Sequence, residues 1–193
     1  MNKKELKIRG IAFTNLKLFI NEKLGINTFK KFFEIIPQEL KKFFSEEIIE
    51  SQFYDLEDFL KIIDYLLKIY EGNKEELMFK IGEYSVQRAY EGPFKIIFDV
   101  SDFQGFVNSI LEFAFKYYFN FGNFKIKEFE PEKGKVKIIV SDIPFKDPFF
   151  EKRLEGGIYS AFKIRGLKNL KSKITKSIAK GDDVIEITLE WEV

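Results

Sequence analysis

The chain has 193 residues, enough for one domain, and its 32 basic and 31 acidic side chains leave a net charge of +1. This balance argues against a nucleic-acid-binding footprint over the whole chain. Histidine and cysteine are both absent, which excludes Ser-His-Asp and Cys-His nucleophiles, zinc sites of the usual nitrogen and sulfur type, and haem held by histidine.

Hydropathy and composition place the chain among globular proteins. No apolar run approaches the roughly 18 residues that a membrane span needs. The opening residues MNKKELKIRG are charged, and no apolar signal-peptide core follows them, which predicts a cytoplasmic protein. The charged residues are mostly Lys and Glu, and Met is scarce. Proteins from hot environments show this bias, and an AT-rich genome explains it equally well.

Apolar residues recur with helical spacing over most of residues 1–92. Gly25 and Gly72 stand at expected C-cap positions, and Asp55 stands at an expected N-cap. Gly82 lies inside a predicted helix, where it costs about 1 kcal/mol relative to alanine, so we expect it to pack closely against a neighbour. Residues 51–54 are predicted to be extended. The predicted helices cover residues 8–24, 28–36, 37–44, 55–70 and 73–91.

The most apolar stretch covers residues 101–122, and its pattern predicts one helix, capped by Ser101 or Asp102. Apolar residues cover well over half of its circumference, whereas a surface helix shows an apolar arc of about 100°. We therefore expect this helix, named here the spine helix, to be buried against several neighbours. Residues 94–100 before it are predicted to form a β-like or short buried link.

Beyond the spine helix the pattern changes from helical to alternating. Two β-hairpins are predicted, at residues 124–140 and 170–191, each with a polar, glycine-containing turn. Between them a predicted helix begins at Pro148 and contains Gly156 and Gly157.

The order of elements is a set of helices followed by ββαββ, which predicts an α+β fold with an antiparallel sheet. There is no internal repeat of fixed period and no Gly/Ser linker. We therefore expect a single domain over residues 1–193, with a helical part at 1–92 and a part made of the long helix and the ββαββ unit at 93–193.

Several short motifs follow this layout. They are GIAFTNLKLFINEKLG at 10–25, IGEYS at 81–85, EGGIYSAFKIRG at 155–166 and AKGDDVIEITLEW at 179–191. Together with the element order, they resemble the ligand-binding superfamily that joins haem nitric-oxide-binding domains, vinyl reductase-type hydrocarbon-binding domains and the core subunits of Golgi tethering complexes. The resemblance spans nearly the whole chain and implies a sensory or ligand-binding domain.

The chain departs from these relatives at their metal-binding positions. Vinyl reductase-type relatives often carry Cys on either side of the last turn, where this chain has Ser177 and Ile185. Haem-binding relatives place a His on a long helix before the hairpins, and the comparable helix, 102–121, has none. They also hold haem propionates with Tyr-x-Ser-x-Arg. The run Tyr84-Ser85-Val86-Gln87-Arg88 is similar, but its spacing and place differ, and we treat this match as accidental. We therefore expect no cofactor, neither haem nor a Cys/His metal site.

The 24 Phe and 8 Tyr allow a cavity for a lipid-like or other apolar ligand, because ligand pockets are mainly hydrophobic with a few polar anchors. The alternative is that these rings simply fill the core, which is the commoner role of aromatic residues at helical spacing. If a pocket exists, its expected wall residues lie on the spine helix and on the helix with the paired glycines. They are Phe106, Ile110, Phe113, Tyr117, Tyr159 and Phe162.

Two sets of charged residues have alternative interpretations. Arg88, one turn after Tyr84, is a candidate anchor for an acidic head group, and surface salt bridging is the ordinary alternative. The run of lysines between Lys168 and Lys180 is the densest in the chain. We interpret it as a solvated or charge-protected strand edge, with nucleic-acid binding as the less favoured alternative.

The sequence leaves two functional hypotheses. The first is a non-enzymatic sensory domain that holds a small apolar ligand in a haem-free pocket between the spine helix and the sheet. The second is a protein-protein interaction module with a solid core that forms a homodimer or docks a signalling partner. An enzyme comes third, because the chain has no His, no Cys, no phosphate-binding loop and no dinucleotide fingerprint.

Overall fold

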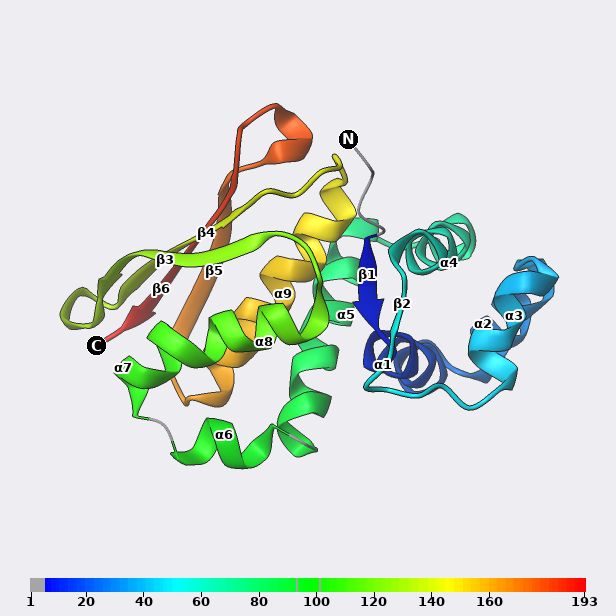
Figure 1. The fold of residues 1–193 in the computed structure, drawn as a ribbon, viewed down its shortest axis with the longest axis horizontal. Coiled ribbons are helices and arrows are strands. Elements are labelled where there is room, and N and C mark those ends of the chain that lie inside the picture. The colour runs from blue at the N-terminus through cyan, green and yellow to red at the C-terminus, as the bar shows by residue number, and fades with distance from the viewer. Residues whose placement is uncertain (1–5, 93, 101) are drawn as a thin grey trace. The chain divides into compact units, whose positions relative to one another are not determined.

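The computed structural model describes residues 6–92, 94–100 and 102–193, so the first five residues, Pro93 and Ser101 lie outside it. Residue contacts divide the chain into two compact units. The first consists of Met1–Lys74 and Tyr117–Asn120, and the second of Glu75–Lys116 and Phe121–Val193. Figure 1 labels the elements of both units.

The first unit consists of short helices and a two-stranded antiparallel ribbon. In the ribbon, β1 (Lys7–Arg9) pairs with β2 (Phe53–Asp55), and Ile8 also bridges to Phe119. The predicted helical cluster and extended segment are confirmed. The helical elements are α1 (Ile11–Phe19), a π-helical turn (Ile20–Leu24), α2 (Ile26–Ile35), α3 (Gln38–Ser45) and α4 (Leu56–Ile69).

Arg9 ties this ribbon to the segment Tyr117–Asn120. Its Nε donates a hydrogen bond to the Tyr117 carbonyl at 3.0 Å, and another guanidinium nitrogen donates to the Ser51 carbonyl. The guanidinium also lies 4.0 Å from the centroid of the Phe53 ring, within cation–π range. One side chain thus holds three segments that are distant in the sequence.

The second unit contains a four-stranded antiparallel sheet in the order β3-β4-β6-β5. Its strands are β3 (Asn123–Glu130), β4 (Lys135–Ser141), β5 (Lys168–Lys176) and β6 (Ile185–Glu192). The unit's helices are α5 (Lys74–Glu91), α6 (Lys95–Val100), α7 (Phe103–Gly105), α8 (Leu111–Tyr118) and α9 (Pro148–Ile164). The predicted α+β class and its ββαββ unit are confirmed.

Two predictions are wrong. The first predicted helix begins at residue 8, but Ile8 and Arg9 belong to strand β1 and helix α1 begins at Ile11. The segment before the spine helix is not β-like, since α6 (Lys95–Val100) is helical. Its run of β-branched and aromatic residues favours a strand, but six residues are too few to show a helical period. Among the described residues, no helix is both long and apolar enough to cross a lipid bilayer.

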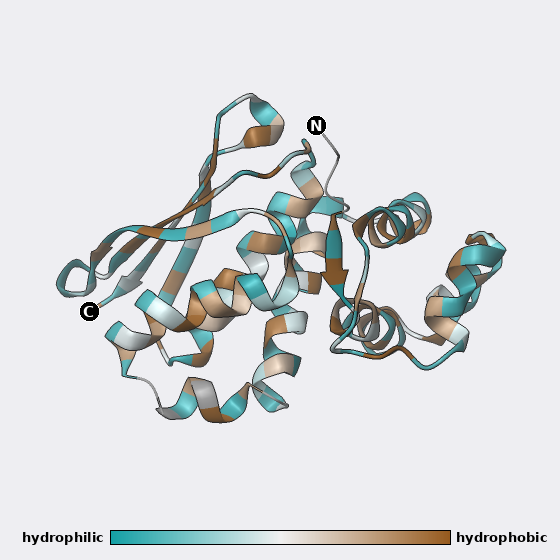
Figure 2. Ribbon diagram, in the orientation of Figure 1, coloured by the Kyte–Doolittle hydropathy of each residue, from teal (hydrophilic) through white to brown (hydrophobic). Residues whose placement is uncertain are grey.

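The sheet has one apolar face and one polar face. Val136, Ile138 and Val140 of β4 are completely buried, as are their partners Leu189, Ile187 and Ile185 on β6. The alternation is visible along the strands in Figure 2 and follows from the two-residue period of a strand. Helix α9 contacts β5 and β6.

Helix α9 also meets α5 at a crossing made of glycines. A Cβ added to Gly82 on α5 would stand 1.9 Å from the Arg153 carbonyl oxygen, and one added to Gly156 would stand 2.0 Å from that of Phe79. Both distances are far shorter than any real contact of a Cβ atom. The prediction that Gly82 packs closely against a neighbour is confirmed, and that neighbour is α9.

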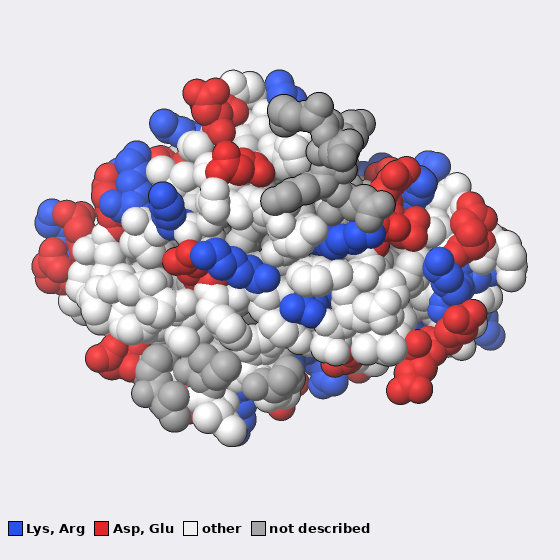
Figure 3. Space-filling view, in the orientation of Figure 1, with Lys and Arg blue, Asp and Glu red and all other residues white. Residues whose placement is uncertain are grey.

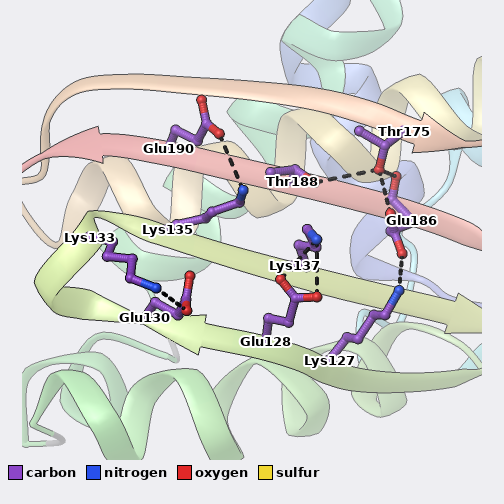
Figure 4. A network of polar contacts seen from close by, with 10 residues as sticks. All are labelled: Lys127, Glu128, Glu130, Lys133, Lys135, Lys137, Thr175, Glu186, Thr188 and Glu190. Atoms are coloured by element: carbon purple, nitrogen blue, oxygen red, sulfur yellow. Dashed lines mark hydrogen bonds and ion pairs between the residues drawn. The ribbon is translucent and has the colours of Figure 1, made fainter.

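Ion pairs join the strands across the polar outer face of the sheet (Figure 4). Lys127 contacts Glu186 at 2.8 Å and Lys137 contacts Glu128 at 2.8 Å. Glu186, although on this face, is only 6% exposed. It also accepts a hydrogen bond from the Thr175 hydroxyl at 2.9 Å, so its carboxylate joins β3, β5 and β6.

The hydrogen bond from Lys127, and next that from Thr175, hold the pKa of Glu186 below its ordinary value. The ionised Glu186 carboxylate therefore stabilises the folded state. This contribution is complete above a pH of about 4.5, the ordinary carboxyl pKa, and is lost as the pH falls through the lowered pKa. We expect Glu186→Gln to cost about 1 kcal/mol at pH 7, because a charge-assisted bond becomes neutral. The difference in free energy of unfolding between Glu186→Gln and wild type should shrink as the pH falls below 4.5. Urea titrations from pH 7 to pH 3 measure it, with Glu132→Gln in an exposed turn as the control.

Candidate ligand-binding site

The spine helix consists of α7, a π-helical turn (Phe106–Ile110) and α8. Asp102 caps it, accepting a hydrogen bond from the Gly105 amide at 2.6 Å. In the π turn the Leu111 amide donates to the Phe106 carbonyl, five residues back rather than four. The predicted apolar helix exists, but it is shorter than residues 101–122 and contains one widened turn.

The widened turn decides which side chains of the spine helix face inward. A regular α-helix that buries Phe106 would also turn residues 110, 113 and 117 toward the core. The extra residue of the π turn shifts this phase, and the buried side chains are those of Leu111, Phe115 and Tyr118. Hydrophobic periodicity does not reveal a π turn, since such turns are rare and local.

Aromatic rings fill the space between the start of the spine helix and α9. The Phe106 ring centroid lies 5.3 Å from that of Phe98 and 5.7 Å from that of Phe162. Phe103 extends the contacts to Trp191 at 5.8 Å and to Phe129 at 5.5 Å. These distances are typical of aromatic contacts in a packed core. We name this set the ring cluster; it contains Phe98, Phe103, Phe106, Phe129, Phe162 and Trp191.

The structure brings together two of the six predicted wall residues, Phe106 and Phe162, both completely buried. The Phe113 side chain is 48% exposed. Ile110 and Tyr159 are half-buried, with the Tyr159 ring 5.3 Å from that of Phe79 on α5. Tyr117, in the first unit, lies 5.0 Å from the Arg9 guanidinium.

The predicted head-group anchor spans one turn of α5. Tyr84 is buried, whereas Arg88 is half-exposed and pairs with Glu91 at 3.5 Å. The ion pair with Glu91 is the ordinary salt bridge that was the alternative interpretation of Arg88. An anchoring role for Tyr84 and Arg88 stays a prediction.

A small hollow lies beside the ring cluster, and no sequence pattern predicted it. It has a volume of about 180 Å³ and is lined by Tyr90, Phe98, Asp99, Ile164 and Arg165. Arg165 donates to the Phe98 carbonyl at 2.5 Å, and its guanidinium lies 5.3 Å from the Phe106 ring centroid. The hollow is smaller than the 300 Å³ or so of a typical ligand pocket. The scarcity of Arg, four against 28 Lys, was the only signal for Arg165.

Two polar side chains that line the hollow form a hydrogen bond with each other. The Tyr90 hydroxyl donates to the Asp99 carboxylate at 3.1 Å. This hydrogen bond raises the pKa of Tyr90, and the nearby Arg165 opposes the shift. Tyr90 is therefore a neutral donor at physiological pH. The hollow thus has an arginine and a neutral phenol beside the aromatic ring of Phe98.

Ser177, at a position where vinyl reductase-type relatives often carry Cys, has a structural role. Its hydroxyl donates to the buried Glu151 carboxylate at 2.6 Å, and the Ala179 amide donates to the same carboxylate at 2.9 Å. Within the described residues, no group of three or more Asp or Glu side chains is arranged to hold a metal ion.

No protein-family model matches the chain, and no curated protein sequence matches it. Solved structures of H-NOX proteins, the haem nitric-oxide-binding class, do match. One from Shewanella oneidensis in the Fe(II)NO state has a TM-score of 0.72 and 12% identity, covering 96% of this chain and 100% of that chain. One from Shewanella woodyi in the Fe(II)CO state has a TM-score of 0.63 and 18% identity, covering 95% and 94%.

A third structure is a histidine-to-glycine mutant of an H-NOX domain from Shewanella oneidensis, in the Fe(II)CO state, with a TM-score of 0.72, 11% identity and coverage of 96% and 99%. This chain therefore has the H-NOX fold over nearly its whole length. The resemblance inferred from its motifs is confirmed at the level of the fold.

These structures overturn the expectation that a chain of this kind takes no cofactor, because all three are described in iron(II) states. That expectation rested on the absence of His and Cys alone, and the third structure is itself a histidine-to-glycine mutant. The donors in this chain nevertheless do not fit an iron held by imidazole or thiolate, since it has neither group. Its remaining donors include the buried phenols of Tyr84 and Tyr118 and the buried thioether of Met78.

Proposed function

We propose that this chain is a non-enzymatic sensory domain that binds a small ligand. The observation that supports it is the match of nearly the whole chain to H-NOX structures described with NO or CO bound. Small apolar molecules, gases included, are the ligand class that its aromatic interior suits. An iron-containing cofactor belongs to the same proposal, although this chain would offer it no imidazole or thiolate.

The proposed ligand contacts the spine helix and α9. Phe106 and Phe162 are the wall residues that meet in the structure, at 5.7 Å, and Ile110 follows on the π turn. The hollow beside Arg165 adjoins them through the Phe106 ring. Moving a small apolar molecule from water into an apolar site is favourable. Aromatic side chains offer a large apolar surface for contact with such a molecule.

A small photoreactive diazirine hydrocarbon tests this location. After irradiation, peptide mapping by mass spectrometry should place the label in residues 103–118 and 148–164. Ile110→Trp should reduce the labelling by narrowing the site, while Phe113→Trp, at an exposed position of the same helix, should not. Label spread over the surface, or equal labelling of both variants, would contradict the location.

A second candidate function is the interaction module with a solid core. The ring cluster favours it, because the rings already fill the space between the start of the spine helix and α9. The second unit also exposes Ile96 by 74% and Phe113 by 48%. In this case the protein would form a homodimer or dock a signalling partner. Sedimentation velocity measures the oligomer, and Ile96→Glu should dissociate a dimer that uses α6.

A further inference from the structure

The central glutamates of the sheet's outer face already have cationic partners. Glu128 and Glu186 pair with Lys137 and Lys127 as described above (Figure 4). Glu190 pairs with Lys135 at 3.8 Å, and Glu130 pairs with Lys133 at 2.7 Å. The four lysines that neutralise these carboxylates come from β3, β4 and the turn between them.

The lysines of β5 on the same face are therefore in excess. Lys171, Lys173 and Lys176, named here the β5 lysines, stand opposite Glu190, Thr188 and Glu186 and are exposed. Among the described residues, the ammonium groups of Lys171 and Lys173 form no ion pair or hydrogen bond. A net charge of +1 for the whole chain makes this stripe a local concentration of positive charge.

Protection of a sheet edge does not by itself explain a stripe of one sign. The sheet has two edges, β3 and β5. Strand β3 carries both signs, Lys125 and Lys127 beside Glu128 and Glu130, whereas the charged residues of β5 are all lysines. Charged side chains, lysine above all, keep an edge from pairing with another sheet, and β3 achieves this with both signs. The single sign on β5 is what an acidic partner would recognise.

The spacing of the stripe indicates the shape of that partner. Lys171 and Lys173 are two residues apart on one strand, which separates their Cα atoms by about 6.7 Å. An extended peptide with acidic residues at alternate positions presents carboxylates with the same repeat. The register irregularity of β5 between Ile174 and Lys176 interrupts the edge, so contact through side chains fits better than addition of another strand.

We propose that the β5 lysines dock an acidic, extended segment of a partner protein. Nucleic acid fits less well, because binding a phosphate backbone calls for a broad cationic surface, and this stripe is confined to three lysines of one strand. On the molecular face drawn in Figure 3, basic and acidic side chains are interspersed, and no broad positive patch is seen. A sensory domain needs an output surface, and this one is distinct from the ligand-binding location.

Fluorescence anisotropy with a labelled (Glu-Thr)6 peptide tests the proposal. Wild type should bind it, and the affinity should fall as salt is raised. Lys171→Glu combined with Lys173→Glu should weaken binding at least tenfold. The matched control, Lys30→Glu with Lys31→Glu on α2, makes the same change in net charge at two exposed lysines and should alter binding less than threefold.

Circular dichroism establishes that both variants are folded. Absence of peptide binding by wild type, or equal losses in the two variants, would overturn the proposal. A single-stranded oligo-dT of similar length serves as a competitor. If it binds more tightly than the peptide and is lost in the Lys171/Lys173 variant, the stripe is a nucleic-acid surface and the proposal is wrong.

Discussion

Replacing Gly82 with alanine should destabilise the second unit by about 3 kcal/mol, the upper end for overpacking a core, or prevent it from folding. The added Cβ would stand 1.9 Å from the Arg153 carbonyl oxygen. Backbone atoms of α9 cannot move away as a flexible side chain does, so α5 and α9 must separate. The gain of about 1 kcal/mol in helix propensity from alanine is too small to compensate.

Gly157→Ala is the matched control, because it makes the same chemical change in the same helix crossing. Its added Cβ would meet the Val86 Cγ2 atom at 3.3 Å, a side-chain contact that small movements relieve. We expect its stability to lie within about 1 kcal/mol of wild type. Urea unfolding followed through Trp191, the single tryptophan, reports on this unit directly. Equal stability of the two variants would show that α5 and α9 leave room for a Cβ atom at Gly82.

Replacing Glu151 with alanine is expected to have the second largest effect, a loss of about 3 kcal/mol, because each buried donor left without an acceptor costs about 1–3 kcal/mol. Glu151 is 3% exposed, and its carboxylate accepts hydrogen bonds from the Ser177 hydroxyl and the Ala179 amide. Glu151→Gln keeps an acceptor and should lose about half as much.

Hydrogen exchange at the Ala179 amide separates loss of this contact from general destabilisation. In Glu151→Ala this amide should exchange much faster than amides in the centre of β6. Glu132→Ala, in the exposed turn of the other hairpin, should leave exchange unchanged. Unaltered protection of Ala179 in Glu151→Ala would mean that the hydrogen bond to Glu151 does not hold the turn.

The sheet and the glycine crossing could be predicted because their signals are local in the sequence. Alternating residues with glycine turns define hairpins, and a glycine such as Gly82 inside a helix is costly enough to need a packing reason. The π turn at Phe106–Ile110 is a local departure from the α-helical ladder and leaves no periodic trace in the sequence. Beyond this turn the predicted wall residue Phe113 is exposed and Phe115 is buried, while the pocket wall itself stays a prediction.

The candidate site was less predictable than the fold for a similar reason. The hollow at Arg165 brings together residues of α5, α6 and α9, and no spacing rule connects them. The β5 lysines form a visible run in the sequence, but their excess of charge depends on the ion pairs that β3, β4 and β6 make with one another. Sequence patterns identify elements, whereas charge balance on a face depends on the register between strands.

Native mass spectrometry tests the central claim, that this H-NOX fold holds a small ligand, most directly. The protein should be purified from cells supplied with iron and a haem precursor, then weighed under native and denaturing conditions. We expect a native mass that exceeds the chain mass by one bound small molecule, released on denaturation and identifiable from its mass and absorbance. The mass of the bare chain under both conditions would contradict the account and favour the interaction module.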